Sequence, residues 1–147
     1  MKKFLLCIIC LITVLTLTGC SKNAITSNNF QSTLEENGYS VSGFDDDRSI
    51  EAKWAVKDDV INVKFYEFDS LQNAIKDYNS IEQEWNTEAN NVFQTKVSNT
   101  AGNYATVSMT FDGKYKYLCR VDKTLLRIDT DEEHKDEAKE LVKKLGY

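Results

Sequence analysis

The chain has 147 residues, of which 41% are hydrophobic and 11% are aromatic, and it contains no proline. This length allows one domain with a substantial core, and the aromatic content excludes a disordered chain. The formal net charge of −5 and the pI near 4.9 argue against nucleic acid as a partner, because phosphates require a basic surface.

The N-terminal segment has the pattern of a secretory leader. Lys2 and Lys3 precede an uncharged stretch, residues 4–17, which has the length of a signal-peptide hydrophobic region and is short for a membrane span. The segment ends in Leu17-Thr18-Gly19-Cys20. This motif resembles the lipobox of bacterial lipoprotein precursors, which has an aliphatic residue, two small residues and a cysteine.

The resemblance implies cleavage between Gly19 and Cys20, a diacylglyceryl group on the Cys20 thiol, and acylation (for example by palmitate) of the new amino terminus. Two or three acyl chains would hold the protein stably on a membrane. We therefore expect residues 1–19 to be a removed signal peptide, 20–29 a lipidated tether and 30–147 a single domain. The expected location is extracytoplasmic, on the outer face of the cell membrane. Without Lys2 and Lys3 the chain has 16 Lys and Arg against 23 Asp and Glu, a net charge of −7.

After the leader, the sequence predicts a short helix ending at Gly38, three strands, a long helix, four strands and a final helix. Alternating apolar residues mark the strands, and apolar residues recurring every three or four positions mark the long helix. The predicted strands are 40–44, 50–56, 60–68, 92–97, 104–111, 115–121 and 125–129, and the later helices are 70–89 and 131–145.

The order α-βββ-α-ββββ-α, with short connections, predicts an α+β fold of two layers. It would hold an antiparallel sheet of about six to seven strands with the helices on one face. Asp112-Gly113 predicts a type I′ hairpin, and we expect the face of 104–111 that carries Val107 to match the face of 115–121 that carries Cys119. The other face of the sheet would stay open, and its polar and aromatic residues would form a partner face represented by Tyr66, Tyr104 and Arg120.

The residues available for nucleophilic catalysis are few. Cys119 is the only cysteine outside the leader and the lipobox, and His134 is the only histidine. The strand pattern places Cys119 in the core, and His134 falls in the first turn of the last helix. Nothing in the pattern brings them together, so a hydrolase is the least favoured function.

Metal binding is also weakly supported. One cysteine and one histidine are too few for a zinc site. The acidic residues after position 128 depart from a calcium loop at His134, where the loop needs glycine, and Thr130 with Glu133 fits a helix capping box better. Asp45-Asp46-Asp47 is interpreted as a solvated loop, with weak calcium binding as a minor alternative. We predict neither a metal nor another cofactor.

The predicted function is a non-enzymatic binding module for an envelope or cell-wall protein. The alternative is a small-ligand carrier with a pocket between helix 70–89 and the sheet, lined by Trp54, Tyr78 and Trp85, although ordinary core packing is the favoured explanation of these residues. Segments 63–68, 112–115 and 145–147 are similar to small surface lipoproteins of Gram-positive bacteria whose function is unknown. That resemblance implies no catalytic residues.

Overall fold

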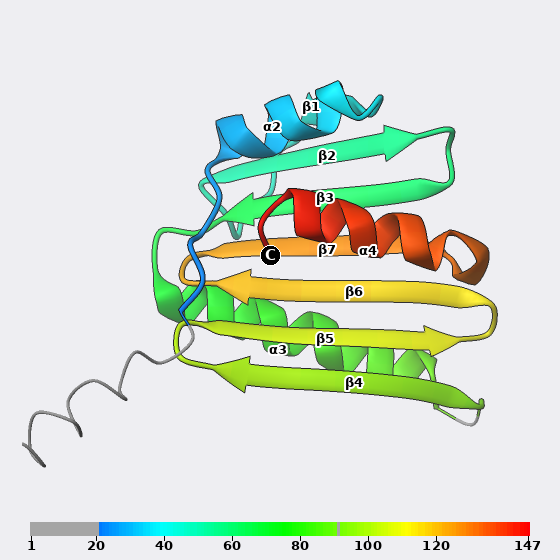
Figure 1. Cartoon of the computed structure of the whole chain (residues 1–147). Helices are drawn as coiled ribbons and strands as arrows, with labels where there is room; N and C mark the ends of the chain where they lie inside the picture. The colour runs from blue at the N-terminus through cyan, green and yellow to red at the C-terminus, as the bar shows by residue number, and fades with distance from the viewer. Residues whose placement is uncertain (1–20, 91) are drawn as a thin grey trace, which may run out of the picture.

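The computed structural model describes residues 21–90 and 92–147 of the chain (Figure 1). The helices are α2 (Ser27–Glu36), α3 (Leu71–Glu88) and α4 (Lys135–Lys144), the last preceded by a 3₁₀ turn, η1 (Glu132–His134). The strands are β1 (Ser40–Gly43), β2 (Glu51–Lys57), β3 (Ile61–Glu67), β4 (Gln94–Ala101), β5 (Tyr104–Phe111), β6 (Lys114–Val121) and β7 (Thr124–Asp131). This element order is the one predicted from the sequence.

The strands β1 to β7 form one antiparallel sheet in the order β1-β2-β3-β7-β6-β5-β4. The strands β1 and β4 are therefore its edges. The predicted α+β class, the antiparallel pairing and the number of strands are confirmed. Within the described residues, no helix is long and apolar enough to cross a membrane.

The helices cover both faces of the sheet. In Figure 1, α2 and α4 lie in front of the sheet and α3 lies behind it. The buried side chains form two clusters, one including Phe30 and Leu141 from α2 and α4 and the other including Tyr78 and Trp85 from α3. The prediction that the helices share one face is therefore wrong for α3.

The position of α3 follows from the connection that it makes. It must carry the chain from the end of β3, near the middle of the sheet, to the start of β4 at the far edge. Its 18 residues span about 27 Å at 1.5 Å per residue. An eight-residue strand spans almost the same length, about 26 Å. The helix therefore returns the chain along the whole sheet and covers the face that α2 and α4 leave open.

The predicted hairpin at Asp112-Gly113 is confirmed, with positive φ angles of 48° and 68°. The residues that flank this turn, Phe111 and Lys114, pair directly. Paired residues share a face, so Val107 lies on the α3 side whereas Cys119 lies on the side of α2 and α4. The predicted match of these two faces is wrong by one residue, because a two-residue turn fixes the register of the strands.

Side-chain caps fix two of the helix starts. Thr26 Oγ1 accepts from the amide of Asn29 at the start of α2, and Ser70 Oγ accepts from the amide of Asn73 at the start of α3, both at 3.2 Å. The capping box predicted at Thr130 is wrong. Thr130 is still part of β7, and its hydroxyl donates instead to the carbonyl of Val60, the residue before β3, at 3.1 Å.

Candidate binding cleft at the Lys22 end of the sheet

The N-terminal segment is attached to the sheet as early as Lys22. Its amide donates to Asn103 Oδ1 at 3.0 Å, and Asn103 Nδ2 donates to its carbonyl at 2.8 Å. Its ammonium lies 5.0 Å from the ring centroid of Tyr104. Lys22 is therefore attached to the sheet, because the Asn103 side chain satisfies both of its backbone groups, and α2 begins at Ser27, within the segment 20–29 that was predicted to be a tether. The predicted cleavage and lipidation residues, Gly19 and Cys20, lie outside the described residues.

A row of hydrogen bonds links the loops at this end of the sheet. The Asp122 amide donates to the Asn103 carbonyl at 2.9 Å, and the Phe68 amide donates to the Lys123 carbonyl at 2.9 Å. The Ile50 amide donates to the Glu67 carbonyl at 2.8 Å. Loops 102–103, 122–123, 68–70 and 44–50 are therefore neighbours. We call this end, defined by these four loops, the Lys22 end.

A cleft of about 390 Å³ lies at the Lys22 end. Its walls come from the connection between β1 and β2, the connection between β3 and α3, and the first half of α3. The polar side chains in its walls include Arg48, Ser49, Lys76 and Asp77. We call it the Arg48 cleft.

One guanidinium organises the charges of the Arg48 cleft. Arg48 Nη1 donates to Asp77 Oδ1 at 2.7 Å, and its Nε and Nη2 donate to the two carboxylate oxygens of Asp46 at 3.0 and 2.7 Å. Asp77 is only 6% exposed, and its second oxygen, Oδ2, has no hydrogen-bond partner. Ser49 Oγ is likewise buried and has no hydrogen-bond partner. Of the four such buried side-chain atoms in the described residues, two therefore belong to the walls of this cleft.

The pKa values of the two carboxylates shift in opposite directions. Its hydrogen bonds hold the pKa of Asp46 below its usual value. Burial raises the pKa of Asp77, and the nearby charge of Arg48 offsets this only in part. A buried carboxylate oxygen without a partner is costly, and a ligand that donates a hydrogen bond, most effectively an ammonium, would remove that cost. Lys76 in the same wall offers a positive charge to an anionic group.

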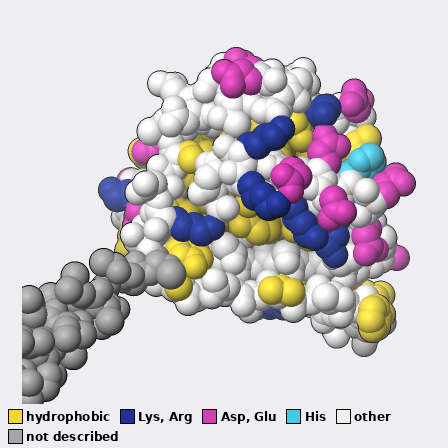
Figure 2. Space-filling view, in the orientation of Figure 1, with side chains coloured by type: hydrophobic (Ala, Val, Ile, Leu, Met, Phe, Trp, Pro, Cys, Tyr) yellow, Lys and Arg dark blue, Asp and Glu magenta, His cyan; other side chains and the backbone are white. Residues whose placement is uncertain are grey.

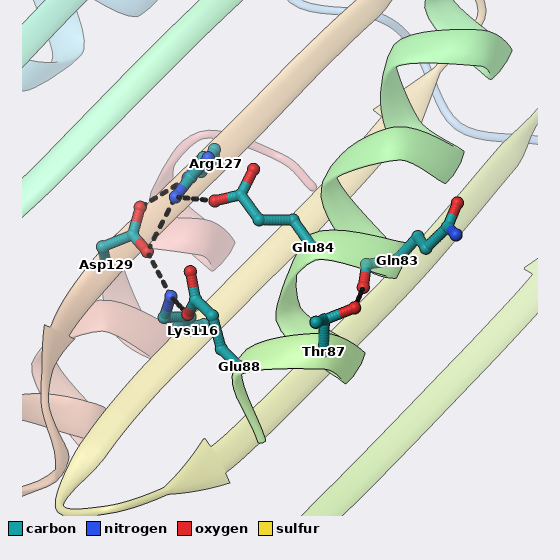
Figure 3. A network of polar contacts seen from close by, with 7 residues as sticks. All are labelled: Gln83, Glu84, Thr87, Glu88, Lys116, Arg127 and Asp129. Carbon is teal, nitrogen blue, oxygen red and sulfur yellow. Dashed lines mark hydrogen bonds and ion pairs between the residues drawn. The ribbon is translucent and has the colours of Figure 1, made fainter. Parts of the chain in front are cut away.

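A larger cleft of about 590 Å³ lies at the opposite end of the sheet, but both of its lysines, Lys114 and Lys116, are already paired with carboxylates. Figure 3 shows the network beside it. Arg127 Nε donates to Asp129 Oδ2 at 2.6 Å and Arg127 lies 3.6 Å from Glu84. Lys116 pairs with Glu88 and lies 3.7 Å from Asp129. These ion pairs join the second half of α3 to β6 and β7, and they leave this cleft less suited to a charged ligand than the Arg48 cleft.

The residues of the predicted ligand pocket do not meet. Tyr78 and Trp85 are packed in the core beneath α3, where the Trp85 ring lies 5.5 Å from both Lys116 Nζ and Arg127 Cζ. Trp54 lies on β2, is 40% exposed and donates to Asn62 Oδ1 at 3.3 Å. The pocket predicted from these three aromatics is therefore wrong, and core packing explains Tyr78 and Trp85.

The predicted partner face is also wrong. Tyr66, Tyr104 and Arg120 are 4%, 8% and 7% exposed. Tyr66 belongs to the cluster on the α3 side and Tyr104 to the cluster beneath α2 and α4. Arg120 Nη1 donates to the carbonyls of Asn103 and Asp122 at 3.1 and 3.3 Å. Because helices cover both faces, these side chains have structural roles. Figure 2 shows the face of α2 and α4, where basic and acidic side chains are intermixed over the helices.

Cys119 and His134 are separated in the structure. Cys119 is fully buried, as predicted, and burial raises the pKa of its thiol to about 11. The amide of Glu132 donates to the Gly113 carbonyl, which places η1 and His134 beside the β5–β6 turn. Cys119 lies five residues along β6 from Lys114, about 17 Å from that turn. This pair therefore cannot act as nucleophile and base.

Three of the acidic residues considered for calcium are paired with cations instead. Asp46 binds Arg48, Asp129 binds Arg127, and Asp131 pairs with Lys114. Among residues 21–90 and 92–147, no three His, Cys, Asp or Glu side chains are grouped as metal ligands.

The residues of the Arg48 cleft that were not predicted from the sequence are Arg48, Ser49, Lys76 and Asp77. A signal for Asp77 is present, because it falls between Ala74 and Tyr78 on the buried stripe of α3. A carboxylate at such a position must be buried and paired with a cation. Its partner comes from a loop, which the periodicity of apolar residues does not describe.

No family model matches the chain, and no curated protein matches it. Among solved structures, a GTP binding regulator from Thermotoga maritima is similar, with 14% identity, a TM-score of 0.48, and coverage of 87% of this chain and 90% of that chain. The extracellular domain of PknH from Mycobacterium tuberculosis is similar with 12% identity and a TM-score of 0.36, over 84% of this chain and 69% of that chain. Both likenesses concern the fold alone.

Proposed function

We propose that the chain is a lipid-anchored extracytoplasmic binding module that holds a small polar ligand in the Arg48 cleft. The leader and the lipobox ending at Cys20 support the anchor and the location. The observation that carries the binding function is the Asp77 carboxylate, which is 6% exposed and has an unpaired oxygen in the wall of the cleft.

The chemistry of the cleft defines the class of ligand. Asp77 Oδ2 accepts a hydrogen bond from an ammonium, and Ser49 Oγ provides a second polar contact. Lys76 pairs with a carboxylate or phosphate of the same ligand. A volume of about 390 Å³ suits a small zwitterion such as an amino acid or phosphoethanolamine.

The ligand proposal is tested by titrating phosphoethanolamine and free L-amino acids into the purified protein by calorimetry. A hydrogen bond to a charged group is worth about 1.5–3 kcal/mol, so Asp77→Asn should weaken the binding of a probe about 10- to 100-fold. Asp129→Asn is the matched control, because Asp129 also pairs with an arginine but lines the other cleft. Equal affinities for Asp77→Asn and the parent protein, or no binding by any probe, would contradict the proposal.

The anchor is tested separately by cell fractionation. The parent protein should sediment with membranes, and Cys20→Ala should lose that association because no acyl chain is attached. Retention of Cys20→Ala in the membrane fraction after removal of the leader would contradict a lipid anchor.

A second candidate function, an interaction with an envelope protein, is favoured by β4. Phe93 and Val97 are 93% and 63% exposed, and β4 is an edge strand whose outer backbone groups can pair with another strand. Phe93→Ser should then reduce chemical cross-linking to an envelope protein in intact cells. Unchanged cross-linking would remove this candidate.

A further inference from the structure

Two large apolar side chains are exposed at the Lys22 end. Ile50 is 66% exposed and Leu71 is 43% exposed. The backbone of Ile50 is held by its hydrogen bond to Glu67, and Leu71 is the first residue of α3, directly after the capping residue Ser70. Both side chains therefore project from ordered backbone, and their exposure is a fixed feature of this end.

The attachment of Lys22 limits how far this end can lie from Cys20. Two residues of extended chain reach at most about 7 Å, which is comparable to the headgroup layer on one side of a bilayer, about 5–8 Å thick. Lys22 is bound next to β5, and Ile50 precedes β2, four strands away. At about 4.8 Å per strand, these positions are about 19 Å apart along the same end of the sheet.

We propose that the Lys22 end rests on the lipid bilayer, with Ile50 and Leu71 in contact with lipid. This inference depends on the proposed lipidation of Cys20. Because Ile50 also lines the Arg48 cleft, it places that cleft beside the lipid headgroups. An anchor on one side of the end and two apolar side chains on the other would hold the end against the membrane. Four other large apolar side chains are exposed in the described residues. Trp54 and Val97 lie within β2 and β4, and Val92 and Phe93 precede β4, about one strand length, 26 Å, from the Lys22 end.

The expected contact is apolar and not electrostatic. At this end Arg48 is bound by Asp46 and Asp77, and the Lys123 ammonium donates to the Asp69 carbonyl. The four loops of this end carry five aspartates against Arg48 and Lys123, so even with Lys22 and Lys76 beside them they hold no surplus of positive charge for anionic headgroups. Contact of Ile50 with lipid should change little with salt, in contrast to binding through a basic patch.

Photo-crosslinking tests this contact. p-Benzoylphenylalanine replaces Ile50, Leu71 or Phe93, one position at a time, in the full chain, and lipid adducts are measured by mass spectrometry after irradiation of membranes. The first two positions should form phospholipid adducts in both low and high salt, and position 93 should not. Equal adduct yields at positions 50 and 93, or cross-links from position 50 to protein alone, would overturn the inference.

A second arm separates this inference from the proposed lipidation. Residues 20–147, prepared without acylation, are coupled through the Cys20 thiol to a maleimide lipid in phosphatidylcholine vesicles. Cys119 is fully buried in the folded protein and should not react. Adducts at positions 50 and 71 here would support bilayer contact even if the cellular protein proved unmodified at Cys20. Their absence in these vesicles would overturn bilayer contact even if Cys20 is lipidated in the cell.

Discussion

Removal of the Asn103 side chain should release the N-terminal segment from the sheet. Asn103 makes two hydrogen bonds to the backbone of Lys22, at 3.0 and 2.8 Å. Each is worth about 1 kcal/mol, so Asn103→Ala should lower the free energy of local opening at Lys22 by about 2 kcal/mol. Since 1.4 kcal/mol corresponds to a factor of ten, the Lys22 amide should exchange with solvent about 30-fold faster.

Amide hydrogen exchange measured by NMR tests this prediction. The matched control is Asn99→Ala. Asn99 lies on the adjoining strand, β4, and its side-chain Nδ2 donates to the Tyr104 hydroxyl but not to Lys22. The control should leave exchange at Lys22 unchanged, and Asn103→Ala should leave the core amides of β6 and β7 protected. An unchanged exchange rate at Lys22 in Asn103→Ala would show that this side chain does not hold the segment next to Cys20 on the sheet.

Two further predictions concern stability. Trp85 is fully buried, so Trp85→Ala should lower the free energy of unfolding, measured in urea, by about 3–5 kcal/mol. Trp54 is 40% exposed, so Trp54→Ala should lower it by about 1 kcal/mol. Equal losses would contradict the placement of the two side chains. Burial raises the pKa of Cys119 from 9.0 to about 11 and that of Tyr66 from 10.0 to about 12, so both groups favour the folded state below pH 9, and the melting temperature should fall as the pH rises from 9 to 12. Cys119→Ala should reduce the fall between pH 9 and 11, and a melting temperature that stays constant up to pH 12 would contradict these shifts.

The order of helices and strands was predictable because each has a local signal. The Asp112-Gly113 turn and the alternation of apolar residues in the strands are read from neighbouring positions. The arrangement of the layers depends on the face of the sheet against which α3 packs, and no local sequence pattern predicts that face. One signal was present, because Leu125 and Leu126 are adjacent and both fully buried. Adjacent strand residues point to opposite faces, so a run of two such leucines predicts that both faces are covered.

The candidate cleft was less predictable than the fold. It is formed by Arg48 from a loop and Asp77 from α3, which are 29 residues apart in sequence and meet through a hydrogen bond of 2.7 Å. The predicted partner face and the predicted layers were wrong for the same reason. Tyr66 and Arg120 lie on the face of the sheet that α3 covers. The position of Cys119 was predictable, because a lone cysteine within an alternating strand is favoured in the core.

We propose that Cys20 anchors the domain to a membrane. Mass spectrometry of the N-terminal tryptic peptide from membrane-purified protein shows whether Cys20 is modified, because trypsin cleaves after Lys22 and leaves Cys20-Ser21-Lys22. We predict a chain that begins at Cys20 and carries a thioether-linked diacylglyceryl group. A chain that retains residues 1–19, or a Cys20 with a free thiol, would contradict the claim.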